Sequence, residues 1–226
     1  MVRFVAKAAL GLIILSVLWV VVYRFVPVPF TWPMARDAIA GTHMQRQWVG
    51  LSAIAPAMPR AVIGAEDARF CAHNGFDFGA MEAAAARNAK AAAKGSRKVR
   101  GGSTISQQTA KNAFLWPGRS YVRKALEAYF TVLIEAIWGK PRIMEVYLNI
   151  AEMGPGIYGV EAAAQHYFDT SAAALTPAQA ARLAAILPQP IERNAAAPGR
   201  FVKRYARRIE KRARVVRRAG IDGCLR

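Results

Sequence analysis

The first pattern along the chain is an uninterrupted apolar run near the N-terminus. The sixteen residues from Ala8 to Tyr23 (AALGLIILSVLWVVVY) include no charged side chain. Lys7 and Arg24 flank the run and can extend their charged ends toward water, so the apolar span reaches the roughly 20 residues that a membrane-crossing helix needs. We therefore predict a transmembrane anchor over residues 8–28, preceded by a short N-terminal segment, residues 1–7.

A cleaved secretory signal is the alternative for this run. A signal peptide ends in a cleavage site made of small residues, and no such pattern follows the apolar core. Three prolines within residues 27–33 follow it instead, and proline does not continue a helix. We predict a linker over residues 29–45, and then one globular domain over residues 46–226.

The rest of the chain has mostly helical periods. Between Arg119 and Trp138, apolar residues recur every three or four positions, which is typical of one face of a long helix. Gly139 is placed to end that helix, and Thr176-Pro177 has the pattern of a helix start. Further predicted helices cover residues 78–94, 104–112 and 200–218. Because strand-like alternation is scarce, the predicted fold class is mostly α.

Charge is the strongest signal in the composition. The 226 residues carry a formal net charge of +18, which predicts an anionic partner such as nucleic acid, an acidic membrane surface or a phosphorylated substrate. The predicted helix over residues 200–218 holds ten Lys and Arg against one acid, Glu210. Two interpretations stay open for it: a solvated face over a packed apolar stripe, or contact with anionic lipid headgroups beside the anchor.

Cysteine and histidine give little chemistry. Cys71 and Cys224 cannot build a disulfide scaffold or a four-ligand zinc site by themselves. They are 153 residues apart, and nothing in the sequence places them together, so we expect them to be unpaired. The three histidines have no spacing typical of metal ligands, and no metal site is predicted.

The first candidate for acid–base chemistry lies in the segment AEDARFCAHNG. On a continuous helix, Glu66, Phe70 and His73 would share one face, and Gly75 would end the helix. A carboxylate beside an aromatic ring and a histidine can have a raised pKa that suits proton transfer. The alternative is an ordinary surface Glu-Asp pair.

The second candidate site is the segment RGGSTISQQTAKN, residues 100–112. Thr104 and Gln107 have the spacing of a capping box, and a helix start after two glycines offers free N–H groups to an anion. Lys111 lies four residues beyond Gln107, on the same face. A capped helix after a loop is the plainer interpretation. The basic stretch before it, residues 94–102, is predicted to be a loop that becomes ordered when an anionic ligand binds.

The third candidate is the segment VRKALEA. Arg123 and Lys124 lie four and three residues before Glu127, so all three share one helical face. They could form a cationic site with a carboxylate beside it. An intrahelical salt bridge is the alternative.

Together these segments resemble a known family. EDARFCAHNG, GGSTISQQTAKN, RKALEA, KPRIMEVYLNIAEMGPGIYGVEAAAQHYF and LTPAQAARLAAILP stand in the order and spacing of the peptidoglycan glycosyltransferases, over about residues 50–190. The chain carries no Ser-x-x-Lys and no Lys-Thr-Gly, motifs that an acylating transpeptidase needs. It therefore resembles the monofunctional members of the family.

The resemblance implies a mostly α, lysozyme-like fold behind one transmembrane helix in the bacterial inner membrane. Residues 1–7 would be cytoplasmic and the domain periplasmic; the charges flanking the anchor do not decide this orientation. The implied activity is polymerisation of lipid II into β-1,4-linked glycan with inversion at the donor anomeric carbon. The implied partners are lipid II, the nascent glycan strand, membrane lipids and other cell-wall synthesis and division proteins, with no nucleic acid. No cofactor is certain, and a divalent-cation dependence is left open.

Roles for individual residues follow from the matching motifs. Glu66 matches the general base, and Glu127 matches the second active-site glutamate. The residues that match the pyrophosphate-holding cations are Lys111, Arg123 and Lys124, and those that match the cleft lining are Ser103, Thr104 and Gln107. Two alternatives are kept: a membrane-anchored lysozyme-like enzyme that cuts glycan, and a basic membrane scaffold without catalysis.

Overall fold

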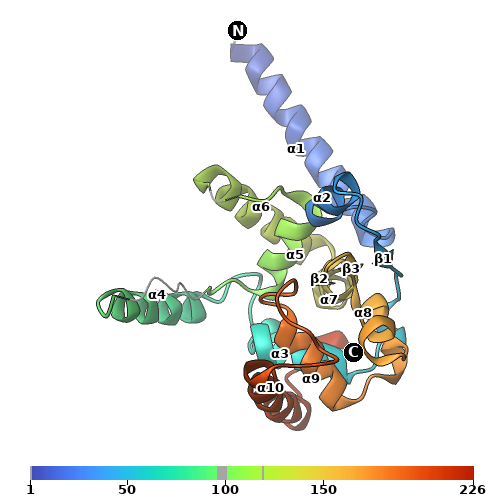
Figure 1. Ribbon diagram of the computed structural model, residues 1–226. Coiled ribbons are helices and arrows are strands. Elements are labelled where there is room, and N and C mark those ends of the chain that lie inside the picture. The colour runs from blue at the N-terminus through green and yellow to red at the C-terminus, as the bar shows by residue number, and fades with distance from the viewer. Residues whose placement is uncertain (1, 96–100, 119) are drawn as a thin grey trace.

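The structure is a computed structural model that describes residues 2–95, 101–118 and 120–226. It is mostly helical, as predicted, and its helices surround one small sheet (Figure 1). The α-helices are α1 (Val2–Phe25), α2 (Trp32–Ile39), α3 (Ala57–Glu66), α4 (Phe78–Ala92), α5 (Ile105–Phe114), α6 (Tyr121–Ile137), α7 (Gly139–Ile150), α8 (Val160–Phe168), α9 (Pro177–Ile186) and α10 (Arg200–Arg218). The short 3-10 helices are η1 (Leu51–Ala53), η2 (Phe70–Ala72), η3 (Ala172–Ala174) and η4 (Gly223–Leu225).

Helix α1 extends away from the rest of the molecule (Figure 1). Within the described residues it is the one helix that is long and apolar enough to cross a membrane, over Arg3–Phe25. Its large apolar side chains, such as Leu12 and Leu15, are exposed. The helix ends at Phe25 because Pro27 cannot continue it, so residues 26–28 of the predicted anchor lie outside the helix.

The C-terminal half of α1 is docked on the domain. The Ser16 hydroxyl lies 2.7 Å from the Tyr129 hydroxyl of α6. The indole nitrogen of Trp138 donates to the Val20 carbonyl at 2.7 Å, and the Arg142 guanidinium donates to the Tyr23 carbonyl at 2.8 Å. The last turns of the anchor therefore have fixed partners on the domain.

The segment predicted as a linker, residues 29–45, contains helix α2 and is tied down. The Tyr158 hydroxyl donates to the Asp37 carboxylate at 2.7 Å, and Arg36 pairs with Glu152 at the same distance. Both partners belong to the sheet, in which β3 (Ile157–Tyr158) lies between β1 (Gln45–Arg46), parallel to it, and β2 (Glu152–Gly154), antiparallel.

Two groups of helices form the core. Helices α3, α9 and α10 pack together, and α5 packs between α6 and α7. The buried side chains that join them include Ile63, Ile105, Ile134, Leu148 and Leu183. Helix α10 has the predicted bounds, and α6 ends before Gly139, which has a φ of +73°.

Helix α4 stands apart from this core (Figure 1), and Ala84 is its one buried residue. It ends at Ala92, two residues before the predicted end. Of the stretch 94–102 that was predicted to become ordered with a ligand, residues 96–100 lie outside the described residues.

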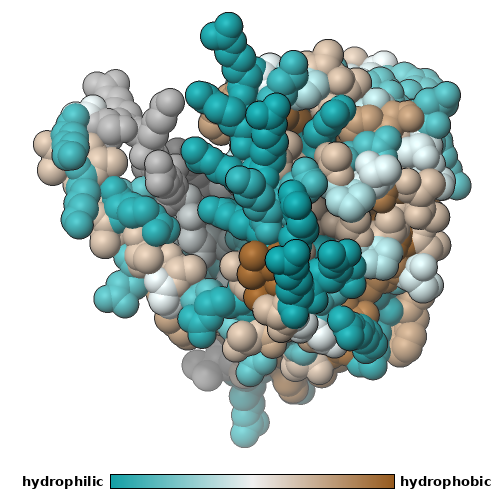
Figure 2. Space-filling model, turned by 90° about the horizontal axis from the view of Figure 1, so that it is seen from below, coloured by the Kyte–Doolittle hydropathy of each residue, from teal (hydrophilic) through white to brown (hydrophobic). Residues whose placement is uncertain are grey.

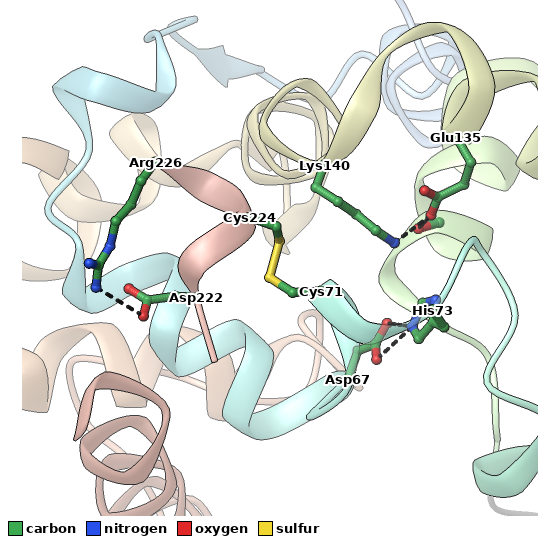
Figure 3. The surroundings of a disulfide bond; sticks show 9 residues. Asp67, Cys71, His73, Glu135, Lys140, Asp222, Cys224 and Arg226 are labelled. Atoms are coloured by element: carbon green, nitrogen blue, oxygen red, sulfur yellow. Dashed lines mark hydrogen bonds and ion pairs between the residues drawn. A yellow bond between two sulfur atoms is a disulfide. The ribbon is translucent and has the colours of Figure 1, made fainter. Parts of the chain in front are cut away.

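The expectation for the cysteines is wrong. Cys71 and Cys224 form a disulfide, with their Cα atoms 5.5 Å apart. Figure 3 shows it joining η2, just after α3, to η4 near the C-terminus. The sequence held no signal for this pair, because tertiary packing of η4 against α7 brings the C-terminal segment back to the domain centre.

Candidate active site

The helix predicted to carry both Glu66 and His73 is interrupted. Helix α3 ends at Glu66, and Asp67 leaves helical geometry with φ −155° and ψ 78°. The chain then makes the single turn η2, and His73 is buried. The prediction of one continuous face through Glu66, Phe70 and His73 is therefore wrong. The break makes Glu66 the last residue of its helix.

The Asp67 side chain explains the break. Its carboxylate accepts from His73 Nε2 at 3.0 Å and from the Ile105 backbone N–H at 3.0 Å. The Gly75 N–H donates to His73 Nδ1 at 3.1 Å, which leaves Nε2 as the protonated nitrogen facing Asp67. Asp67, labelled with His73 in Figure 3, thus fixes the end of α3 against the start of α5.

Gly75 is the residue that lets this turn pass close to α6. Its φ is +89°, a conformation that favours glycine. A Cβ at this position would lie 2.7 Å from Thr131 Cγ2. The Gly75 carbonyl also accepts from the Thr104 hydroxyl at 2.6 Å. The turn after α3 is therefore shaped by both α5 and α6.

Glu66 is partly buried and has a perturbed carboxylate. Burial raises its pKa above the ordinary value, and the charge of Asp67 raises it further. A hydrogen bond from Gln108 Nε2, at 3.2 Å, and the cation of Arg193 act in the opposite direction. The net effect is a raised pKa, which suits a group that accepts a proton near neutral pH.

The start of α5 confirms the predicted capping box. The Thr104 hydroxyl accepts from the Gln107 N–H at 3.1 Å, and the Gln107 side chain accepts from the Thr104 N–H at 3.0 Å. Both side chains are buried, whereas Ser103 just before them is exposed. Thr104 and Gln107 therefore hold the helix start, and their role in lining a substrate cleft stays a prediction.

The predicted cationic cluster is assembled around Glu127 on α6. Glu127 is 3% exposed. Its carboxylate accepts from Arg123 Nη1 at 3.0 Å and pairs through its other oxygen with Lys124 Nζ. This is the geometry of the intrahelical salt bridge that the sequence left as an alternative. Lys124 nevertheless keeps almost half of its side chain exposed.

Lys111, on α5, faces the same cluster. Burial lowers the pKa of its ammonium, the Glu127 carboxylate raises it, and the cations Arg123 and Lys124 lower it, with a net decrease. The Nε atom of Arg123 is buried and has no hydrogen-bond partner among the described residues. Three cations thus share one carboxylate, so positive charge is left over for an anion.

Two adjoining hollows lie beside these cations. One, of about 340 Å³, is lined by residues that include Lys111, Arg123 and Trp116. The other, of about 210 Å³, is mostly apolar and is lined by Trp19 of α1 together with α2 and the end of α5. Both include Trp32, Asn112 and Leu115. A charged hollow therefore continues into an apolar one at the base of the anchor.

Helix α5 connects the two glutamates. Gln108 and Lys111 are three residues apart and so lie on one face; the first binds Glu66 and the second faces Glu127. Gln108 and Arg193 are not among the site residues predicted from the sequence. The Gln-Gln pair in GGSTISQQTAKN was a usable signal, because one glutamine is needed for the capping box and its neighbour must point elsewhere. No sequence signal indicated Arg193.

No group of three or more His, Cys, Asp and Glu side chains that could hold a metal ion occurs in the described ranges. A divalent-cation dependence stays a prediction.

The comparisons with known proteins decide the family. A family model described as Transglycosylase matches residues 35–219. The chain belongs to the transglycosylase family. It is 56% identical over 206 residues to the biosynthetic peptidoglycan transglycosylase of Caulobacter vibrioides, covering 91% of this chain and 88% of that protein.

Other transglycosylases are similar over nearly the whole chain. The biosynthetic peptidoglycan transglycosylase of Jannaschia sp. is 48% identical over 222 residues, covering 98% of this chain and 89% of that protein. That of Rhodospirillum centenum is 46% identical over 224 residues, covering 99% and 95%. The family predicted from the five sequence motifs is confirmed.

Proposed function

We propose that this transglycosylase polymerises lipid II into β-1,4-linked glycan strands, with inversion at the donor anomeric carbon and release of undecaprenyl pyrophosphate. The observation that carries the proposal is the placement of two unlike groups along one face of α5. A carboxylate with a raised pKa, Glu66, contacts Gln108 on this helix, and a cluster with excess positive charge surrounds Lys111 one turn later.

Glu66 is the general base in this proposal. The acceptor 4-hydroxyl oxygen attacks the donor anomeric carbon, and its proton passes to the Glu66 carboxylate. The bond between that carbon and the phosphate oxygen breaks, and its electron pair stays on the pyrophosphate. Attack from the face opposite the leaving group inverts the anomeric centre. The hydrogen bond from Gln108 orients the carboxylate.

The cations act on the leaving group. Lipid pyrophosphate is already ionised near neutral pH and needs positive charge more than it needs an acid. Lys111, Arg123 and Lys124 supply that charge, and the Arg123 Nε without a partner offers a further donor. In the proposal Glu127 holds Arg123 and Lys124 in place. Because one carboxylate cannot neutralise both cations, net positive charge remains to bind the phosphates.

The adjoining hollows support a lipid-linked donor. The hollow with Lys111 and Arg123 suits phosphates, and the apolar hollow at Trp19 suits the start of a polyprenyl chain. Because Trp19 belongs to α1, the reaction would take place beside the membrane surface. This supports a single-pass membrane protein, and in the proposal that membrane is the inner membrane and the domain is periplasmic, where lipid II is presented. The nascent strand would be a further ligand, and other cell-wall synthesis and division proteins would be partners.

The test is polymerisation of purified lipid II by the full chain in detergent. We expect glycan strands that lengthen with time, and a rate lowered by roughly 10²–10⁴-fold with Glu66→Gln. Addition of preformed glycan separates the alternatives. A lysozyme-like enzyme would shorten the glycan, and a scaffold without catalysis would change neither the glycan nor lipid II. Shortened glycan without polymer, or no reaction with a folded protein, would contradict the proposal.

A further inference from the structure

The strongly basic helix α10 lies at the end of the molecule opposite the free end of α1. Figure 1 shows α1 and α10 at the two extremes of the structure, with the other helices between them. If α1 crosses the membrane, α10 points away from it. The interpretation that α10 touches lipid headgroups beside the anchor is therefore not compatible with this placement.

Packing fixes which face of α10 is free. The stripe Val202, Ala206, Ile209, Ala213 and Val216 is buried against α3 and α9. The ten Lys and Arg side chains of the helix are all exposed. Within the described part of the chain, these side chains make one ion pair, between Arg214 and Glu210 at 3.4 Å.

The free charge is concentrated on one surface. Seen from the end opposite the anchor, long hydrophilic side chains gather over a broad area of the molecule (Figure 2). A helix of 19 residues is about 28 Å long. The surface therefore offers a row of cations rather than a single site, which suits a ligand with repeated negative groups.

A hollow opens at the N-terminal half of this row. It has a volume of about 780 Å³ and lies between α9, the segment before α10, and α10 itself. Cationic side chains of Arg182, Lys203 and Arg207 line it, with Glu210 as the one acid. The remaining lining residues are small: Ala178, Ala196, Ala197, Pro198 and Ala206. Small side chains among cations leave room for an anionic group rather than filling the space.

Residues on α10 and in the segment before it lie close to Glu66. Arg193 stacks over the Phe201 ring at 4.9 Å, and its charge acts on Glu66. Tyr205, on α10, also lies within the electrostatic reach of Glu66. Lys203 and Arg207 come two residues before and after Tyr205. Because residues two apart point to different sides of a helix, a polymer bound near Glu66 would pass around α10, about 10 Å across, to reach the hollow.

We propose that this hollow and the exposed cations of α10 bind the carboxylates of stem peptides on peptidoglycan strands. The inference rests on the proposed function, which makes such strands the product. Peptide carboxylates repeat along a strand, and the planar guanidinium of Arg207 or Arg182 can bind a carboxylate through two parallel hydrogen bonds. A ligand of this kind is found on the side of the membrane where the domain is proposed to lie, whereas nucleic acid is not.

The experiment measures binding of fluorescently labelled, soluble peptidoglycan strands to the full chain in detergent at about 0.15 M salt, where only close charges act strongly. The test variant is Lys203→Gln with Arg207→Gln. The control variant is Arg87→Gln with Lys90→Gln, which removes the same charge from the exposed face of α4. An exposed ion pair changes an equilibrium constant by up to about fivefold, so we expect the loss of two cations to raise Kd by roughly fivefold in the test variant and by less than twofold in the control.

Three further arms make the result specific. Strands whose carboxylates have been converted to amides should bind the wild type no better than the test variant binds native strands. The charge-conserving variant Lys203→Arg, which keeps the Arg207 guanidinium, should bind like the wild type. Vesicles with about one third anionic lipid should bind the wild type and the test variant equally. Equal loss in test and control variants, undiminished binding of amidated strands, or an effect confined to vesicles would overturn the inference.

Strand binding is measured without lipid II, so its outcome does not depend on turnover. The same proteins are assayed for lipid II polymerisation, where we expect the test variant to keep its initial rate within about twofold. A wild type that binds strands through α10 but does not polymerise would contradict the proposed function alone. If the wild type polymerises lipid II but its Kd for strands is the same as that of the Lys203→Gln and Arg207→Gln variant, the inference alone would be contradicted.

Discussion

At the residue scale, the environment of Glu66 links proton transfer to stability. Its raised pKa means that the folded protein binds a proton at Glu66 more tightly than the unfolded chain does. Ionisation of Glu66 therefore lowers the free energy of unfolding as pH rises from the ordinary value of a glutamate through the raised value. The same ionisation is required for a general base. Function and stability have opposite requirements at this residue.

The first prediction is that Glu66→Gln lowers polymerisation by roughly 10²–10⁴-fold, the usual contribution of a general base. The melting temperature above the titration window should equal or exceed that of the wild type, because the amide removes a partly buried charge. In the wild type, turnover should fall as pH decreases through the raised pKa. Activity within a few-fold of the wild type would remove Glu66 from this role.

The second prediction concerns Lys124. Its ion pair with Glu127 is consistent both with a cationic site for pyrophosphate and with a purely structural salt bridge. If Lys124 stabilises the departing pyrophosphate, its interaction strengthens in the transition state, and Lys124→Ala should lower turnover by at least roughly 10²-fold. Substrate binding should weaken less than turnover. Lys124→Arg tests geometry, because a planar fork does not replace a compact ammonium.

The salt-bridge alternative gives a different pattern for the same variant. Glu127 is buried and keeps Arg123 as a partner at 3.0 Å, so loss of Lys124 would lower the melting temperature modestly. Activity would then fall only in proportion to unfolding. Thermal melts beside single-turnover kinetics separate the two. Unchanged turnover per folded molecule would leave Lys111 as the better candidate.

At the element scale, the disulfide ties together parts of the chain that no helix connects. Cys71 lies on η2, between the end of α3 and His73, and Cys224 lies on η4. The bond closes a loop with a sequence separation of 153 residues. It therefore restrains the unfolded chain strongly and also holds the C-terminal segment near the turn that carries Asp67.

The third prediction is that Cys71→Ser with Cys224→Ser lowers the free energy of unfolding by about 2–5 kcal/mol, the usual cost of removing a native disulfide. Urea unfolding at equilibrium measures this. The wild type in reducing buffer should unfold at the same denaturant concentration as the variant in either buffer. A wild type insensitive to reductant would show that the two thiols are not joined in solution.

At the scale of the whole molecule, the anchor and the basic helix α10 define two ends with different surroundings. One end carries exposed apolar side chains along α1, and the other carries ten exposed cations. The charges close to α1 do not choose an orientation, because Arg3 and Lys7 lie on one side and Arg24 and Arg36 on the other. Orientation is therefore argued from the function.

The fourth prediction is that residues 1–7 are cytoplasmic and the chain from about residue 30 is periplasmic. A reporter that is active only in the periplasm should be active when fused after Arg226. A reporter that needs the cytoplasm should be inactive at the same position. The reverse result would contradict the orientation and, with it, access of the domain to lipid II presented on the periplasmic face.

Features that depend on local pattern could be predicted from the amino-acid sequence. The long apolar run, the capping box of Thr104 and Gln107, and the stop at Gly139 are read from neighbours a few residues apart. The capping box and the stop are found where predicted, and the apolar run forms a helix that begins before the predicted anchor and ends three residues earlier. The family followed from ordered motifs. Spacing also placed Arg123, Lys124 and Glu127 on one face, because three or four residues make one helical turn.

Features that depend on contacts between distant segments became visible in the folded structure alone. The end of α3 at Glu66 is fixed by Asp67 binding the N–H of Ile105, 38 residues further along. The pairing of Cys71 with Cys224 and the separation of α10 from the anchor are likewise outcomes of packing between elements. A helical pattern records which face is buried but not which partner buries it. The same limit concealed Arg193, whose charge reaches Glu66 only after the chain has folded.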